Sequence, residues 1–118
     1  MRSIVMLMIE TEQPEGLSAR KLVVETARHN VLTAYNSKEG LDLLHRFPKV
    51  DAVLVHAQLA KCEEMIAEIR RTHPEMPIIV ASPMLNAHYP GATFVIPSHE
   101  PAALLDVLSK GLHLSIKN

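Results

Sequence analysis

Short apolar runs recur along the chain, and polar or amphipathic stretches separate them. Five runs predict β-strands, at residues 4–9, 31–35, 50–55, 77–81 and 93–96. Most residues of these runs are apolar and follow one another directly, whereas a strand with one solvent-exposed face would alternate apolar and polar residues. Continuous runs of this kind are typical of a parallel sheet that is covered on both faces.

Amphipathic segments between these runs predict helices. The clearest spans residues 61–72, where Met65, Ile66 and Ile69 share one face. Asn36 and Glu39 form a capping box that begins another helix, which ends before Pro48. Two further helices are predicted, at residues 14–28 and at 101–112. Alternation of strands and helices predicts an α/β fold with a doubly wound parallel sheet.

One crossover departs from this regular alternation. Only residues 82–92 separate the fourth and fifth predicted strands, and they include Pro83, Pro90 and Gly91. Two prolines in so short a connection leave room for a turn or two of helix. We therefore predict that the fourth helix is short or missing.

Length and composition narrow the class of protein. The 118 residues, 47% hydrophobic and 21% charged, predict a single domain over residues 1–118. A net charge of −1 disfavours nucleic acid or an anionic membrane as partners. The opening apolar run is shorter than a signal sequence, and no stretch reaches the roughly 18 apolar residues of a spanning helix. We expect a cytoplasmic protein.

Several segments resemble the receiver domain of bacterial two-component response regulators. They cover nearly the whole chain, at residues 14–34, 37–41, 50–55, 77–80, 91–92 and 100–101. The resemblance implies a flavodoxin-like, five-stranded parallel sheet of order 2-1-3-4-5. It also implies a signalling role in a two-component system or phosphorelay.

The resemblance implies a defined chemistry at the carboxyl ends of the strands. In receivers two acidic residues hold Mg²⁺, an aspartate accepts phosphate, and a hydroxyl and a lysine contact the phosphoryl group. Carried over, the acidic pair falls on Thr11 and Glu12, the phosphoacceptor on His56, the hydroxyl on Ser82, and the lysine on Pro97 or Ser98.

Only two of these positions keep matching chemistry, Ser82 well and Glu12 approximately. Without a carboxylate at position 56 there is no acyl-phosphate acceptor, and an imidazole reaches farther than the aspartate that it replaces. We therefore predict a pseudo-receiver without aspartate phosphorylation, without catalytic residues and without a cofactor, Mg²⁺ included. It would act through a protein partner or self-association, either as a free-standing adaptor or as part of a longer regulator.

The alternative is a small-ligand or metal-binding flavodoxin-like domain that uses the carboxyl edge of the sheet. Its candidate metal ligands are Glu10, Glu12 and His56, with His99 as a further candidate. No spaced motif supports this set, so we interpret the acids as solvated loop residues and His56 as a capped strand end that is hydrogen-bonded to one of them. An enzyme is the least favoured class, because no nucleophile–base pair and no glycine-rich phosphate loop are present.

Three further features carry open or structural interpretations. Met84, Leu85 and Tyr89 either cover the sheet where a helix is missing or form an exposed apolar patch for a partner. Cys62, the single cysteine, is interpreted as a packing residue. Four of the seven histidines fall near predicted helix ends, where exposed carbonyls favour the imidazolium form: His29, His45, His73 and His113.

Overall fold

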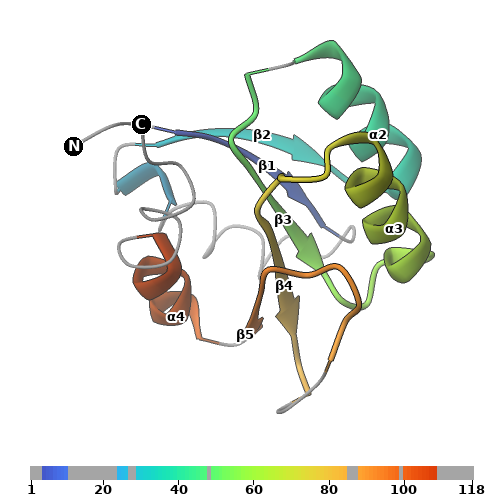
Figure 1. Ribbon diagram of the computed structural model, residues 1–118. Helices are drawn as coiled ribbons and strands as arrows, with labels where there is room; N and C mark the ends of the chain where they lie inside the picture. Colours follow the sequence, from blue (N-terminus) through green and yellow to red (C-terminus); the bar gives the residue numbers. More distant parts are fainter. Residues whose placement is uncertain are drawn as a thin grey trace.

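A computed structural model gives the arrangement of the chain and describes residues 4–10, 24–26, 29–47, 49–84, 88–98 and 100–108. Five parallel strands form one sheet in the order β2-β1-β3-β4-β5 (Figure 1). This confirms the predicted fold and strand order. The strands are β1 (Val5–Ile9), β2 (Asn30–Ala34), β3 (Ala52–His56), β4 (Ile78–Ser82) and β5 (Phe94–Pro97).

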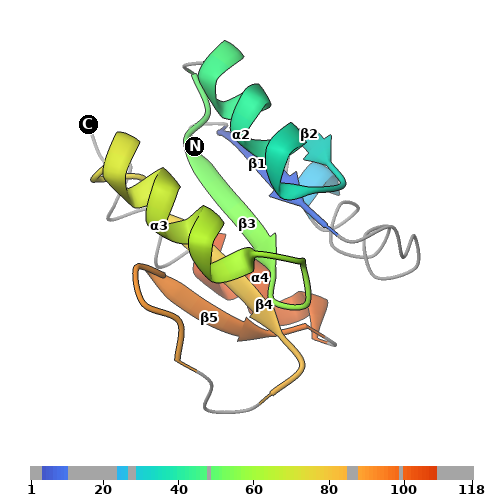
Figure 2. The ribbon, with the colours of Figure 1, turned by 90° about the vertical axis from the view of Figure 1, so that its right-hand side faces the viewer.

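Helices lie on both faces of the sheet, as predicted. One face is covered by α2 (Ser37–Arg46) and α3 (Cys62–Thr72), and the other by α4 (Pro101–Asp106) and a helical turn at 24–26 (Figures 1 and 2). Successive strand residues point to opposite faces, so the core divides into two clusters. Leu7, Ile9 and Val55 belong to the cluster under α2 and α3, and Met8 and Leu54 to the one under α4.

The start of α2 shows how its sequence fixes its position. The Asn36 side-chain oxygen accepts a hydrogen bond from the Glu39 N–H at 2.7 Å, and the Glu39 carboxylate accepts one from the Tyr35 N–H at 2.8 Å. The first of these bonds is the one that the predicted capping box requires, whereas the Glu39 carboxylate reaches the residue before the N-cap Asn36. One turn later, Gly40 is buried against Ile9, whose Cδ1 would lie 2.6 Å from a Cβ at position 40. The missing side chain lets α2 approach β1 closely.

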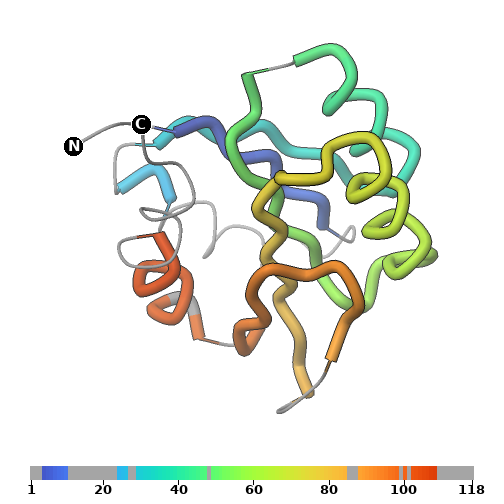
Figure 3. Tube along the Cα trace, in the orientation of Figure 1, coloured from blue at the N-terminus to red at the C-terminus, as the bar shows by residue number. Residues whose placement is uncertain are grey.

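The connection from β4 to β5 contains no helix among its described residues, which agrees with the predicted loss of the fourth helix. Figure 3 follows the trace of its described residues. Tyr89 and Ala92 pack against that core cluster, and Gly91, at φ +89°, lies against Ile66. The crossover thus replaces part of the missing helical cover.

One side chain of α3 holds this crossover in place. The Arg70 guanidinium donates hydrogen bonds to the carbonyl oxygen of Gly91 at 2.6 and 3.2 Å. It also donates to the carbonyls of Pro74 and Met76, each at 2.8 Å. The planar fork of an arginine suits several acceptors at once. Arg70 therefore joins the end of α3, the entry to β4 and the crossover.

Candidate functional site

The carboxyl ends of the strands bring several predicted site residues to one edge of the sheet. In the parallel register His56 is paired with Ala81, and Ser82 with Pro97. The Ser98 N–H donates to the Ser82 carbonyl at 2.8 Å, which extends the contact beyond β5. Four of the six predicted pocket positions therefore lie along this edge on adjacent strands. Thr11 and Glu12 lie outside the described residues, as does His99.

His56 ends β3 and is half-buried. Its Nδ1 atom accepts a hydrogen bond from the Gln58 N–H at 3.1 Å. Because Nδ1 accepts there, a neutral His56 ring carries its proton on Nε2. The imidazole thus stabilises the turn between β3 and α3, whereas its predicted hydrogen bond to Glu10 or Glu12 stays a prediction.

Ser82 is almost fully buried, with 1% of its surface exposed. Its hydroxyl lies 3.1 Å from the hydroxyl of Tyr89, and it accepts a hydrogen bond from the Met84 N–H at 3.1 Å. The crossover therefore encloses the one hydroxyl that matched the receiver pattern well. Glu10, directly after β1, is equally buried and is itself engaged in a polar contact, so its interpretation as a solvated loop acid was wrong.

The crossover was expected either to cover the sheet or to form an exposed apolar patch for a partner, and each interpretation fits one of its residues. Tyr89 is half-buried and packs against the core, so it covers the sheet. Met84, in contrast, has 67% of its surface exposed. Leu85 lies outside the described residues. An apolar patch for a partner would thus centre on Met84, with Tyr89 as its support.

A hollow of about 400 Å³ lies beside this edge, between the turn after β3, the start of α3 and Tyr89. Cys62 lies on its wall but is buried in the core cluster under α2 and α3. Burial, together with the negative charge of Glu63, raises the pKa of the Cys62 thiol to about 11. The thiol stays protonated at neutral pH, so the interpretation of Cys62 as a packing residue is confirmed.

Among the described residues, the side chains at this edge offer few of the several oxygen ligands that Mg²⁺ prefers. His56 offers an imidazole where the receiver pattern has a carboxylate, and the Glu10 carboxylate is buried. Within the described ranges no three histidine, cysteine, aspartate or glutamate side chains are placed to hold a metal ion. That search does not reach Glu12, so the absence of a metal stays a prediction.

Comparisons with known proteins identify the fold. No protein-family model and no curated protein matches the chain. Among solved structures, a CheY-like response regulator receiver domain protein from Methanospirillum hungatei JF-1 matches with a TM-score of 0.83 and 19% identity, over 98% of each chain.

Two bacterial structures agree with this match. A receiver domain protein from Clostridium thermocellum has a TM-score of 0.79 at 23% identity, over 96% of this chain and 94% of that one. A response regulator from Thermotoga maritima has a TM-score of 0.79 at 24% identity, over 94% of this chain and 98% of that one. The chain therefore has the fold of the response regulator receiver domain. In the part of the chain that the structure describes, no helix is long and apolar enough to cross a membrane.

Sequence reasoning missed two features near the site. It did not find the Ser82–Tyr89 contact, and it did not find the groove between β2 and α2. The first links residues seven positions apart across a loop and has no periodic signal. The groove did have a periodic signal in the sequence, because Lys38, Asp42 and Arg46 follow one another at four-residue spacing.

Proposed function

We propose that this chain is a single receiver-like domain of a bacterial two-component system or phosphorelay, and that it signals through protein contacts without aspartate phosphorylation. The observation that carries the proposal is His56. It ends the central strand β3, at the position where the receiver pattern has the phosphoacceptor, and its Nδ1 accepts a backbone hydrogen bond. The fold supports the receiver class, and the residue at this position supports the loss of its reaction.

The chemistry of phosphoryl transfer supports the same conclusion. The transferred group carries dispersed negative charge, so the reaction needs cations beside it as well as a nucleophile. The end of β5 offers Pro97 and Ser98, neither of which is basic. The Ser82 hydroxyl is enclosed by the crossover. The carboxylate nucleophile and the basic group are thus both absent from the positions that the receiver pattern assigns to them.

The proposal is tested by following the amide chemical shifts during a titration with Mg²⁺, and then with Mg²⁺ and beryllofluoride, a phosphoryl mimic. We expect no saturable shifts at His56 and Ser82. Saturable shifts at these residues that spread to Met84 and Tyr89 would mean that the pocket still switches, and the proposal would be wrong. A receiver with its acidic pair, aspartate and lysine intact serves as the positive control.

A matched variant, His56→Asp, restores the carboxylate at the end of β3. If beryllofluoride shifts the variant but leaves the wild type unchanged, the substitution at position 56 alone accounts for the loss. If both stay unchanged, the missing basic group or the acidic pair contributes as well. Either result separates the role of His56 from that of its neighbours.

The protein-contact part of the proposal rests on Met84. Its side chain is exposed and its backbone N–H donates to the Ser82 hydroxyl, so a contact at Met84 would lie two residues from the end of β4. Sedimentation velocity at several concentrations tests self-association through this residue. We expect a dimer that weakens in Met84→Ser, whereas a concentration-independent monomer would leave only a different protein as the partner.

A further inference from the structure

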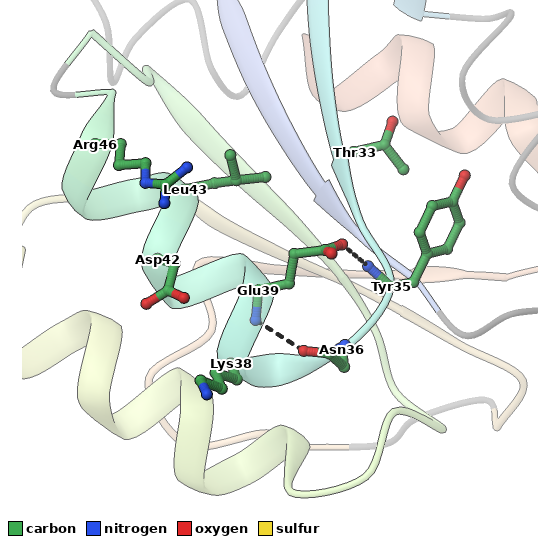
Figure 4. Close-up of a pocket in the computed structure, with 8 residues that line it drawn as sticks. All are labelled: Thr33, Tyr35, Asn36, Lys38, Glu39, Asp42, Leu43 and Arg46. Carbon is green, nitrogen blue, oxygen red and sulfur yellow. Dashed lines mark hydrogen bonds between the residues drawn. The ribbon is translucent and has the colours of Figure 1, made fainter.

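A groove of about 660 Å³ lies between the edge strand β2 and the helix α2, apart from the carboxyl-edge pocket (Figure 4). Thr33 and Tyr35 line it on one side, and Lys38, Asp42 and Arg46 on the other. The chain turns back after β2, so α2 runs along the edge strand in the opposite direction. The groove therefore follows an edge of the sheet.

Along this edge the backbone of β2 has N–H and C=O groups that pair with no other described strand. The Asn30 N–H donates to the Ile4 carbonyl at 2.9 Å, and the Ala34 carbonyl accepts from the Glu10 N–H at 2.9 Å. Parallel pairing alternates, so Val31 and Thr33 direct their N–H and C=O groups away from β1. No other described strand pairs with β2. Such an edge is a template for an added strand.

Charges follow the helical side of the groove in a regular row. Lys38, Asp42 and Arg46 are spaced by four residues, with signs plus, minus and plus, and all three are exposed. None of them forms an ion pair with another described residue. The remaining acid of the groove, Glu39, is already engaged by the Tyr35 N–H. The row is thus available to a ligand.

The pitch of this row matches that of an extended peptide. Four residues of α-helix rise about 6 Å, and two residues of a β-strand about 6.6 Å. Alternate side chains of a strand share one face. A strand lying in the groove would therefore place every second side chain opposite one charge of the row, and the complementary order is acidic, basic, acidic. Leu43 adds an apolar contact between the charges.

We propose that this groove binds an extended segment of a partner protein, which adds to β2 as a sixth strand and carries acidic, basic and acidic residues at alternate positions. Backbone hydrogen bonds to Val31 and Thr33 hold the segment, and the row on α2 selects its charge pattern. The inference does not depend on the phosphorylation state of the carboxyl-edge pocket.

Fluorescence anisotropy with two labelled peptides tests the charge pattern. The probe Thr-Glu-Val-Lys-Val-Glu-Thr carries the complementary order, and Thr-Lys-Val-Glu-Val-Lys-Thr carries the reverse. At low salt we expect the first to bind about tenfold more tightly, because each of its charges lies opposite a charge of the other sign on α2. The combined substitutions Lys38→Glu, Asp42→Lys and Arg46→Glu should reverse this preference. Equal binding of both peptides, or no binding of either, would overturn the proposal.

A control separates the row from the overall charge of the protein. Lys61→Glu, at the start of α3, lowers the net charge by the same amount as the triple substitution but lies outside the groove. It should leave the preference for the first peptide intact. All substituted side chains are exposed, so circular dichroism should show an unchanged fold in each variant. Loss of the preference in the control would attribute it to net charge and overturn the proposal.

N-methylated versions of the first peptide test the strand addition itself. In an added strand only alternate N–H groups face β2, so methylation of one alternate set removes the hydrogen bonds while methylation of the other set spares them. We expect about a tenfold loss of affinity for one set and little change for the other. Equal tolerance of both sets would show that no strand is added, and the proposal would be wrong.

Discussion

The hydroxyl groups of Ser82 and Tyr89 lie 3.1 Å apart and join the last residue of β4 to the crossover that follows it. Ser82 is almost fully buried, and its hydroxyl also accepts from the Met84 N–H. Tyr89 packs on the core cluster under α2 and α3. Its ring therefore contacts that face of the sheet, while its hydroxyl contacts Ser82 at the sheet edge. The shape of the crossover therefore depends on a polar contact at the strand end.

Removing one hydroxyl should weaken this contact without disturbing the packing. Tyr89→Phe keeps the ring, and we expect the free energy of unfolding to fall by about 1 kcal/mol, the usual net value of one hydrogen bond. Urea denaturation followed by circular dichroism measures it. Tyr35→Phe is the matched control, because Tyr35 is exposed and the effect there should stay within about 0.5 kcal/mol. Equal losses in the two variants would contradict the role given to Tyr89.

Arg70 should be the most sensitive basic residue of α3. Its guanidinium donates to the carbonyls of Pro74, Met76 and Gly91, and a lysine ammonium at that position cannot reach all three. We expect Arg70→Lys to lower the free energy of unfolding by about 1 kcal/mol, since the partly buried Met76 carbonyl and the exposed carbonyls of Pro74 and Gly91 cannot all keep a donor. Urea denaturation measures the change.

The neighbouring arginine provides the control for that experiment. Arg71 pairs only with Glu68 among the described residues, and 70% of its side chain is exposed. Exposed ion pairs contribute roughly 0–1 kcal/mol, so Arg71→Lys should have little effect. If the two substitutions cost the same, Arg70 does not anchor the crossover.

The strands could be predicted from the sequence because each is a continuous apolar run. Their bounds moved by one or two residues, most clearly in β3, which was expected at 50–55 and lies at Ala52–His56. Pairing decides these ends. The Val50 N–H turns back to the Phe47 carbonyl, whereas His56 stays in the ladder beside Ala81 despite its polar side chain. The residues of one strand do not indicate where the neighbouring strand pairs with it, so the exact strand ends could not be predicted.

Contacts between distant parts of the chain could not be predicted in this way. Arg70 and Gly91 are 21 residues apart, and nothing in either sequence segment indicates that they meet. For His29 the prediction was wrong. Its place near a predicted helix end favoured the imidazolium form, but its Nδ1 accepts the Ile4 N–H at 3.1 Å, and burial lowers its pKa. Ile4 lies 25 residues away in the sequence, so the residues around His29 could not indicate that its ring would be held in the neutral form.

The close approach of α2 and β1 predicts an unusual effect of alanine at position 40. Within a helix, alanine is normally favoured over glycine by about 1 kcal/mol. Here a Cβ would lie 2.6 Å from Ile9 Cδ1 and 2.9 Å from its Cγ1, and Ile9 is fully buried. We expect Gly40→Ala to lower the free energy of unfolding by about 1–3 kcal/mol, the usual cost of overpacking a core.

A double-mutant cycle identifies the cause. Ile9→Val removes the Cδ1 atom that lies closest to the new methyl group. Gly40→Ala should therefore cost less in the Ile9→Val background than in the wild type, by more than about 0.5 kcal/mol. Additive effects would mean that Ile9 does not oppose the alanine.

His29 predicts a loss of stability in mild acid. Burial lowers the pKa of its imidazole below the ordinary value of 6.5, and protonation of Nδ1 would break the bond from the Ile4 N–H. Below pH 6.5 the unfolded chain takes up a proton that the folded chain resists, so this contribution is complete above that pH and is lost as the pH falls.

The chain has six other histidines, so the test compares two proteins that share all of them. In His29→Gln the side chain does not titrate, and its amide oxygen can still accept a hydrogen bond. Unfolding free energies measured by urea from about pH 7.5 to about pH 5 should fall more steeply in the wild type than in this variant. Parallel curves would show that His29 takes up its proton equally in both states. A steeper fall in the wild type would assign the difference to His29, because every other histidine is common to the two proteins.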